Sequence, residues 1–279
     1  MVDGQSNNIR VGAIIQARNA STRLPGKVLL PLPFNEGKPI LQIITNFLKR
    51  NTLLDEIIIA TSSNIENDNI RNFAELINVK CFSGSENNVL SRFVSVIKQE
   101  DLDICIRLTA DNPLIDNNTL NNVVHYLIEN ELDYAYTSGM PLGMNIEAFK
   151  ASSLLKSSSA FSLTDEECEH VTLFMKRSGH FKVGMMNVFE NDLFKDIRCT
   201  IDYPSDFAFM NLVLSVIDTR SDLLNELNSL IIKYPWIVNV NKNFQKIQGL
   251  SFTEEVLEAV KLLEKVELKR VAKFLKESS

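Results

Sequence analysis

Three cationic side chains lie within one short loop near the start of this 279-residue chain. Arg18, Arg23 and Lys27 are interspersed with small residues, and the loop directly follows the apolar run Val11–Ile15. Small residues let backbone N–H groups approach phosphate oxygens, while arginine and lysine neutralise the phosphate charge. The loop carries neither a GxxxxGK[ST] nor a GxGxxG pattern. A solvated basic loop is the simpler alternative, but the position after a buried strand favours phosphate binding.

Two carboxylates, Asp111 and Asp202, each follow a predicted strand. Pro204 follows Asp202 closely and predicts the start of a helix there. One or two carboxylates, with phosphate oxygens and water, are the usual ligands of Mg²⁺ in phosphoryl and nucleotidyl transfer. Taken alone, Asp111 is a turn residue and Asp202 a helix cap; beside the cationic loop, they predict a metal site. Asp116 and Asp206 are interpreted as acids at helix starts.

The elements that position these side chains follow an α/β pattern. Apolar runs rich in β-branched residues alternate with amphipathic stretches, which predicts a mostly parallel central sheet flanked by helices. We expect strands at 11–15, 56–61, 79–82 and 103–108, and helices at 39–50, 67–77, 89–99, 119–129 and 204–217. From Asp133 onward, strands expected at 134–137, 145–149, 182–188 and 197–201 have fewer crossover helices, so this part of the sheet is expected to be mixed. Ligands of such sheets bind beyond the carboxyl ends of the strands.

The length allows one large domain with a small appendage. We expect a flexible N-terminus at 1–9, a principal domain at 10–220 and a helical C-terminal extension at 221–279. Within the extension, Ser251 and Glu254 form a capping-box pattern ahead of an apolar helix face.

Charge and composition exclude several classes of protein. A formal net charge of -6 argues against a protein that coats nucleic acid, and 45% hydrophobic residues is typical of a globular protein. No apolar run reaches membrane-spanning length, and residues 1–8 are polar without a signal-peptide core, so no membrane insertion is expected. The four cysteines lie far apart without a CxxC pair, which favours a reducing cytoplasm.

Several colinear segments resemble a known family. They are Ile14–Arg18 with Ser21–Leu29, Ile59–Ser62, Ser83–Glu86 with Val89–Arg92, Arg107–Asp116, Glu169–Thr172 and Thr200–Asp206. Together they resemble the cytidylyltransferases that make CMP-activated acidic sugars, most closely the SpsF-like branch and more distantly CMP-Kdo synthetase. The resemblance implies a Rossmann-like nucleotide-diphospho-sugar transferase fold, similar to that of GT-A glycosyltransferases. It also implies metal binding by Asp111 and Asp202.

The resemblance and the positions after the expected strands extend the predicted nucleotide pocket. The residues expected there are Ala17, Thr22, Thr61, Ser62, Gly84 and Ser85. Arg107 is a cation inside an apolar strand, so it either faces the ligand or pairs with Asp103 or Glu86.

The acceptor side of the pocket is predicted from the same resemblance. Glu147 lies where the family binds its acceptor, and it is expected to hold an acceptor hydroxyl or amine, or a second metal. His170, with Glu169 beside it, is expected to orient the acceptor; packing against a helix is the alternative.

The resemblance, together with the cationic loop and the two acids, implies transfer of CMP from CTP, with Mg²⁺, to a small anionic sugar-like or phosphorylated acceptor for surface polysaccharide synthesis. Arg18, Arg23 and Lys27 are expected to stabilise the leaving pyrophosphate. A GT-A glycosyltransferase using a ready-made nucleotide sugar and a non-catalytic binding protein are the alternatives. Asp101 and Asp103 have the DxD spacing of such glycosyltransferases, but they precede their strand. The sequence leaves the acceptor and the oligomeric state open, a homodimer included.

Overall fold

The computed structural model of the chain describes residues 9–188, 194, 197–242, 251–265 and 267–278. Apart from Ile9, the predicted flexible N-terminus lies outside the described residues. The contacts within the chain divide it into two compact units, Met1–Asn243 and Phe244–Ser279. Among the described residues, none of the helices combines the length and apolar character needed to cross a membrane.

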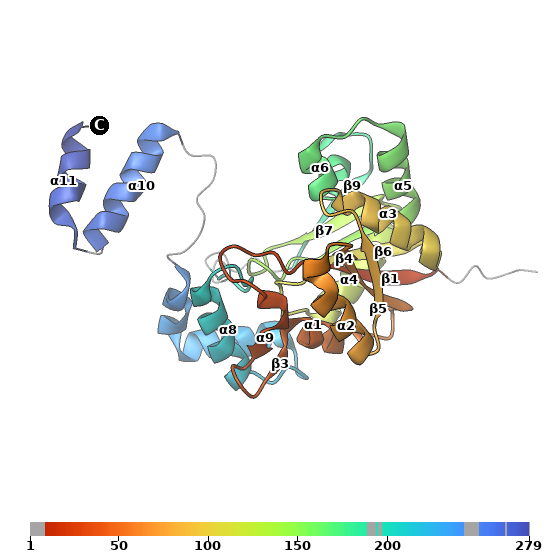
Figure 1. Cartoon of the computed structure of the whole chain (residues 1–279), viewed down its shortest axis with the longest axis horizontal. Helices are drawn as coiled ribbons and strands as arrows, with labels where there is room; N and C mark the ends of the chain where they lie inside the picture. Colours follow the sequence, from red (N-terminus) through yellow and green to blue (C-terminus); the bar gives the residue numbers. More distant parts are fainter. Residues whose placement is uncertain (1–8, 189–193, 195–196, 243–250, 266, 279) are drawn as a thin grey trace, which may run out of the picture. The chain divides into compact units, whose positions relative to one another are not determined.

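The first unit is built on a seven-stranded sheet with the order β5-β4-β1-β6-β8-β7-β9 (Figure 1). Its strands are β1 Val11–Gln16, β4 Glu56–Ser62, β5 Lys80–Gly84, β6 Ile104–Thr109, β7 Tyr134–Ser138, β8 Glu147–Lys150 and β9 Val183–Asn187. The pairs β1–β4, β1–β6, β4–β5 and β7–β9 are parallel, whereas β8 runs antiparallel to β6 and β7. A separate short hairpin joins β2 (Pro31–Leu32) to β3 (Lys38–Pro39). The mostly parallel sheet with a mixed edge confirms the predicted fold class.

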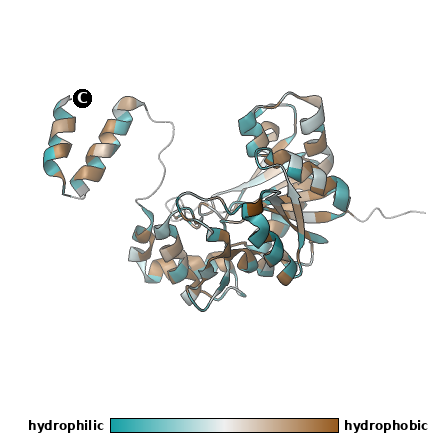
Figure 2. Ribbon diagram, viewed as in Figure 1, coloured by the Kyte–Doolittle hydropathy of each residue, from teal (hydrophilic) through white to brown (hydrophobic). Residues whose placement is uncertain are grey.

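Helices cover both faces of this sheet. They are α1 Ile40–Leu48, α2 Asp68–Leu76, α3 Val89–Glu100, α4 Asn117–Glu129, α5 Ala151–Ala160, α6 Asp165–Glu169, α7 Leu173–Arg177, α8 Pro204–Val216 and α9 Leu223–Lys233, with short 3-10 segments η1 Lys27–Leu29, η2 Ile65–Asn67 and η4 Pro235–Val240. Side chains of β1 alternate between two buried clusters: Ala13 and Ile15 pack with α1, α4 and α8, while Ile14 packs with α3 and α5. Because both faces are buried, hydrophobic residues predominate along the central strands (Figure 2).

Local signals set where three of these helices begin. The Asn88 side chain accepts a hydrogen bond from Ser91 N at 2.8 Å and caps α3. Asp116 caps α4 in the same way, accepting from Thr119 N at 2.8 Å, which confirms its interpretation as a helix-start acid. Pro204 occupies the first turn of α8, where its missing N–H costs no helical hydrogen bond.

Three features differ from the sequence-based expectations. The predicted strand at 197–201 is wrong: among the described residues this buried segment forms an isolated bridge between Leu142 and Arg198 and is not a strand of the sheet. Helices α5, α6 and α7 lie between β8 and β9, where fewer helices were expected. The expected boundary at Arg220 falls inside the first unit, because Leu227 and Leu230 of α9 are buried in its core.

The described part of the second unit is a pair of helices, α10 (Phe252–Lys265) and α11 (Lys269–Ser278). This agrees with the helical C-terminal extension expected from the sequence. Its capping box is formed: Ser251 N donates to Glu254 Oε2 at 2.8 Å, and Glu254 N donates back to Ser251 Oγ at 3.4 Å. Val260, on the predicted apolar face, is buried.

Candidate active site

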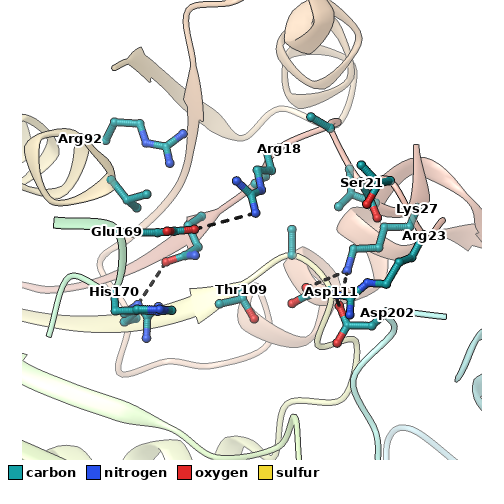
Figure 3. A pocket seen from close by; sticks show the side chains of 18 residues that line it. Arg18, Ser21, Arg23, Lys27, Arg92, Thr109, Asp111, Glu169, His170 and Asp202 are labelled. Carbon is teal, nitrogen blue, oxygen red and sulfur yellow. Dashed lines mark hydrogen bonds and ion pairs between the residues drawn. The ribbon is translucent and has the colours of Figure 1, made fainter. Parts of the chain in front are cut away.

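A cavity of about 550 Å³ lies at the carboxyl-terminal edge of β1 and β6 (Figure 3). Its walls are the loop after β1, the residues after β6, the first turn of α3, the end of α6 and the segment before α8. Five cations line it: Arg18, Arg23, Lys27, Arg92 and Arg107. This local concentration of positive charge suits a polyanionic ligand, although the whole chain has a net charge of -6.

The two predicted metal-binding acids lie side by side around Lys27. Lys27 Nζ donates to Asp111 Oδ2 at 2.9 Å, to Asp202 Oδ1 at 3.0 Å and to the carbonyl oxygen of Ile201 at 2.6 Å. Ile201 N donates to the carbonyl oxygen of Asp111 at 2.9 Å, so the backbone also joins the two acidic segments. The sequence therefore correctly predicted that Asp111 and Asp202 meet beside the cationic loop.

Asp202 is held by more cations than Lys27 alone. Arg23 Nη2 donates to its Oδ1 at 3.2 Å, and Arg198 Nη2 donates to its Oδ2 at 2.6 Å. Arg23 is itself fixed by Tyr203, whose hydroxyl accepts from Arg23 Nη1 at 2.9 Å. Partial burial by itself raises the pKa of the Asp202 carboxyl, but the three neighbouring cations, Lys27 foremost, outweigh burial and keep that pKa below its ordinary value. Asp202 is thus charged at neutral pH.

The Arg107 side chain lines the cavity, and its guanidinium is also hydrogen-bonded to two other side chains. Arg107 Nη1 donates to Glu147 Oε2 at 3.1 Å across the β6–β8 pair, and its Nε donates to Gln16 Oε1 at 3.1 Å. Glu147 Oε2 also accepts from Thr172 Oγ1 at 2.7 Å. Arg107 is therefore paired, although its partners are neither Asp103 nor Glu86, and it also lines the cavity; contact with a ligand stays a prediction.

The remaining cations differ in how tightly they are held. Arg18 is exposed, and its guanidinium lies 4.0 Å from the carboxylate of Glu169, so it is free to turn toward a ligand (Figure 3). Arg92 is buried, and its Nε has no hydrogen-bond partner among the described residues. Burial lowers the pKa of Arg92, and Glu86 opposes that effect. Arg92 is thus a cation on the cavity wall whose Nε is not satisfied by the described protein atoms.

This geometry can be compared with known proteins. A sequence profile of the cytidylyltransferase family matches residues 12–225. The chain belongs to the cytidylyltransferase family. It is 33% identical over 228 residues to the spore coat polysaccharide biosynthesis protein SpsF of Bacillus subtilis, an alignment that covers 80% of this chain and 94% of that protein.

Solved structures agree with the assignment to the cytidylyltransferases. A cytidylyltransferase from Leptospira borgpetersenii serovar Hardjo-bovis superposes with a TM-score of 0.75 at 28% identity, covering 86% of this chain and 100% of that one. CMP:2-keto-3-deoxy-manno-octonic acid synthetase complexed with CTP gives a TM-score of 0.53 at 16% identity over 74% of this chain and 98% of that one, which is a likeness of fold. The predicted fold, family and nucleotidyltransferase class are confirmed.

The cavity of this cytidylyltransferase contains most of the predicted site residues, but not all of them. Ala17, Thr22 and His170 line it together with the cations and acids already described. Glu147 lies behind Arg107 instead of on the cavity wall.

Four of the predicted nucleotide-binding residues lie outside the cavity wall: Thr61, Ser62, Gly84 and Ser85. β4 continues through Ser62, so Thr61 and Ser62 are buried strand residues, and the Ser62 hydroxyl accepts from Asn67 Nδ2 at 2.6 Å. The Ser85 hydroxyl accepts from Asn88 N at 3.2 Å, just before α3. These positions give the four residues a structural part in the strands and the α3 start; direct nucleotide contact by them stays a prediction.

Three residues of the site were missed by the sequence analysis: Arg92, Arg198 and Tyr203. Arg198 lies within an apolar run, as Arg107 does, and the cost of burying an unpaired guanidinium was a usable signal there. Arg92 is the only cation in the first turns of α3, which begins at the ligand edge of the sheet. Tyr203 lies between Asp202 and Pro204 and carries no signal that distinguishes it.

The acidic pair fits a divalent cation. The carboxylates of Asp111 and Asp202 converge on one point, which the Lys27 ammonium occupies. Carboxylate oxygens are ligands that Mg²⁺ prefers, and two of them leave the other positions to phosphates and water. No group of three or more His, Cys, Asp and Glu side chains in the described parts of the chain forms a cation site by itself. The pair therefore suits a metal that arrives together with phosphate ligands.

Proposed function

We propose that this cytidylyltransferase transfers CMP from CTP to a small anionic, sugar-like or phosphorylated acceptor. An acceptor oxygen attacks the α-phosphorus, the bond from that phosphorus to the bridging oxygen of the β-phosphate breaks, and pyrophosphate leaves with the bonding electrons. A proton lost from an acceptor hydroxyl passes to solvent. The observation that carries the proposal is a cavity lined by five cations in which Lys27 joins Asp111 to Asp202.

The roles follow from how each side chain is held. Arg18 is exposed at the cavity mouth and loosely paired, so we assign it to the β- and γ-phosphates, with Arg23 and Lys27 closer to the acids. These cations stabilise the charge that develops on pyrophosphate, so positioning and electrostatics supply the catalysis without a covalent nucleophile. Mg²⁺, held by Asp111 and Asp202, would neutralise phosphate charge and orient the triphosphate.

The acceptor is assigned to the side of the cavity that Arg107 and His170 line. His170 follows α6, beside Glu169, and faces the cavity opposite the acidic pair (Figure 3). Since SpsF of Bacillus subtilis is named for spore coat polysaccharide biosynthesis, we propose a surface polysaccharide precursor as the acceptor class. All four cysteines are free thiols, which supports a cytoplasmic reaction. The homodimer stays a prediction.

The glycosyltransferase alternative has less support. Asp103, in the DxD-spaced pair, precedes β6, and its Oδ2 accepts from Arg10 N at 2.8 Å. Asp101 ends α3 with a positive φ of 50°. Both acids thus lie at the amino-terminal edge of β6, opposite the cavity.

Pyrophosphate release separates the two functions. We expect the purified chain with Mg²⁺ and a panel of sugar acids and sugar phosphates to release pyrophosphate with CTP, and much less with ATP, GTP or UTP. Asp111→Ala should abolish the release, while the matched control Asp103→Ala should leave it near the wild-type rate. Release of UDP from a UDP-sugar, or equal rates with all four nucleotides, would show that the proposal is wrong.

A further inference from the structure

Asp206 is a buried carboxylate whose oxygens are fully engaged. Its Oδ2 accepts from Asp202 N and Tyr203 N, each at 2.9 Å, and its Oδ1 accepts from Arg198 Nε at 2.9 Å. The residue is 0% exposed. A carboxylate can accept about four hydrogen bonds, and a buried one is stable only when they are made. Asp206 is therefore more than a helix-start acid, because it fixes the backbone of Asp202.

Arg198 extends this hold from the backbone of Asp202 to its carboxylate. While Nε is bound to Asp206, Nη2 donates to Asp202 Oδ2 at 2.6 Å. The rigid guanidinium fork thus transmits the position of one carboxylate to the other. Asp202 Oδ1 remains directed at Lys27, on the cavity side.

Asn241 closes the network from a distant part of the chain. Its Nδ2 donates to the carbonyl oxygen of Arg198 at 2.9 Å and to Asp206 Oδ1 at 3.0 Å, and the residue is 1% exposed. Asn241 directly follows η4, which is anchored by the buried Ile237. It lies beyond residues 12–225, where the family profile matches.

We propose that Asn241 is a positioning residue that sets the geometry of Asp202 for metal binding through Asp206 and Arg198. The proposal rests on the assignment of Asp202 as a metal ligand. Without Asn241, the buried carbonyl of Arg198 loses its side-chain donor, and Asp206 Oδ1 is left with Arg198 alone. Groups that orient a metal ligand typically change metal affinity by about 10–100-fold when they are removed.

The test measures the affinity of Mn²⁺, a paramagnetic substitute for Mg²⁺, for the full chain with CTP and without an acceptor. We expect Asn241→Ala to weaken Mn²⁺ binding about tenfold or more, while CMP, measured without metal, binds as it does to the wild type. Asn241→Ser is a smaller change, because serine retains a hydroxyl donor, and it should weaken Mn²⁺ binding less than Asn241→Ala does. The serine variant replaces the alanine variant in the test if the alanine variant does not fold.

Asn51→Ala is the matched control. Asn51 is also a buried asparagine with two acceptors, donating to Asn117 Oδ1 at 3.1 Å and Asn121 Oδ1 at 2.9 Å, and it does not line the cavity. It should lower the melting temperature but leave Mn²⁺ affinity within about twofold, since a structural role alone does not alter the metal ligand. Equal losses in both variants, or unchanged affinity in Asn241→Ala, would overturn the inference.

Asp202→Ala separates this inference from the proposed function. If that variant loses Mn²⁺ binding while Asn241→Ala retains it, Asp202 is a ligand and only the positioning role of Asn241 is wrong. If Asp202→Ala binds Mn²⁺ normally, the metal assignment itself is wrong, and the role of Asn241 is wrong with it.

Discussion

Replacement of Lys27 by methionine tests whether its ammonium holds the two acids together. Met keeps the length and most of the volume of the side chain but removes the charge that Asp111 and Asp202 share. We expect the variant to be less stable than the wild type, and to regain more stability from Mg²⁺. The physical reason is that two close carboxylates repel each other unless a cation lies between them.

The magnitude follows from burial. The Lys27 side chain is 10% exposed, whereas those of Asp111 and Asp202 are 28% and 22% exposed. Removing one partner of a buried ion pair costs about 3–5 kcal/mol. Because both acids keep some contact with water, we expect about 2–3 kcal/mol. For a domain of this size, that corresponds to a fall in melting temperature of about 4–12 °C.

Thermal unfolding with and without Mg²⁺ measures both effects. Mg²⁺ at 100 times its dissociation constant stabilises the folded state by about 2.7 kcal/mol, and we expect this gain at lower concentrations in Lys27→Met than in the wild type. Lys80→Met is the matched control: Lys80 also joins two carboxylates, Glu56 and Glu100, but its side chain is 50% exposed, so a loss of at most about 1 kcal/mol is expected. The shared-cation explanation would be refuted by a melting temperature for Lys27→Met within 1 °C of wild type. It would also be refuted if Mg²⁺ raised the melting temperatures of Lys27→Met and the wild type equally.

Further variants test the two acids, the cationic loop and the close contact of Gly143 with Thr200. Because the pKa of Asp202 is lowered in the folded state, its charge stabilises the protein above about pH 4 and that contribution is lost as the pH falls further; the stability gap between wild type and Asp202→Asn, measured by urea unfolding, should therefore close in acid. Asp111→Ala should lower turnover by orders of magnitude with unchanged circular dichroism; near-normal Mg²⁺-dependent turnover would remove its assignment. Arg18→Ala should lower kcat about 100–1,000-fold while CMP affinity stays unchanged, and a parallel loss of CMP binding would place Arg18 at the nucleoside end. Gly143 has a φ of +96°, and a Cβ there would lie 2.6 Å from Thr200 N, so Gly143→Ala should lower both the melting temperature and Mn²⁺ affinity; a shift of the melting temperature alone would separate Gly143 from the site.

The fully buried strands were the most predictable part of the fold. β1 and β6 are mostly apolar because helices cover both of their faces, and both were predicted within a residue or two. The same signal failed at 197–201, since an extended segment buried outside the sheet has the same composition as a central strand. Helix α5 was missed because its sequence, ASSLLKSSSA, is rich in serine, which has only moderate helix propensity.

Site residues were predictable where a charged side chain follows the carboxyl end of a predicted strand. Lys27 lies in the segment after β1 and Asp111 comes after β6; because these two strands are adjacent and parallel, both residues lie at the same edge of the sheet. Thr61 and Ser62 were placed in the pocket from the resemblance and from their position at the end of the expected strand, whereas β4 continues through Ser62 and both side chains are buried.

The position of Asp202 was harder to predict than that of Asp111, because different parts of the fold hold the two acids in place. The strand before Asp111 belongs to the sheet, so hydrophobic periodicity fixes its position. Within the part of the chain that the structure describes, the segment before Asp202 pairs with other backbone through a single β-bridge, to Leu142. Its place depends instead on the close approach of Gly143 to Thr200, the Arg198–Asp206 pair and the amide of Asn241, which are contacts between residues up to 57 positions apart. No periodic pattern encodes such contacts, so the sequence indicated Asp202 through its place before Pro204, the cationic loop and the resemblance to a family, but not the contacts that hold it.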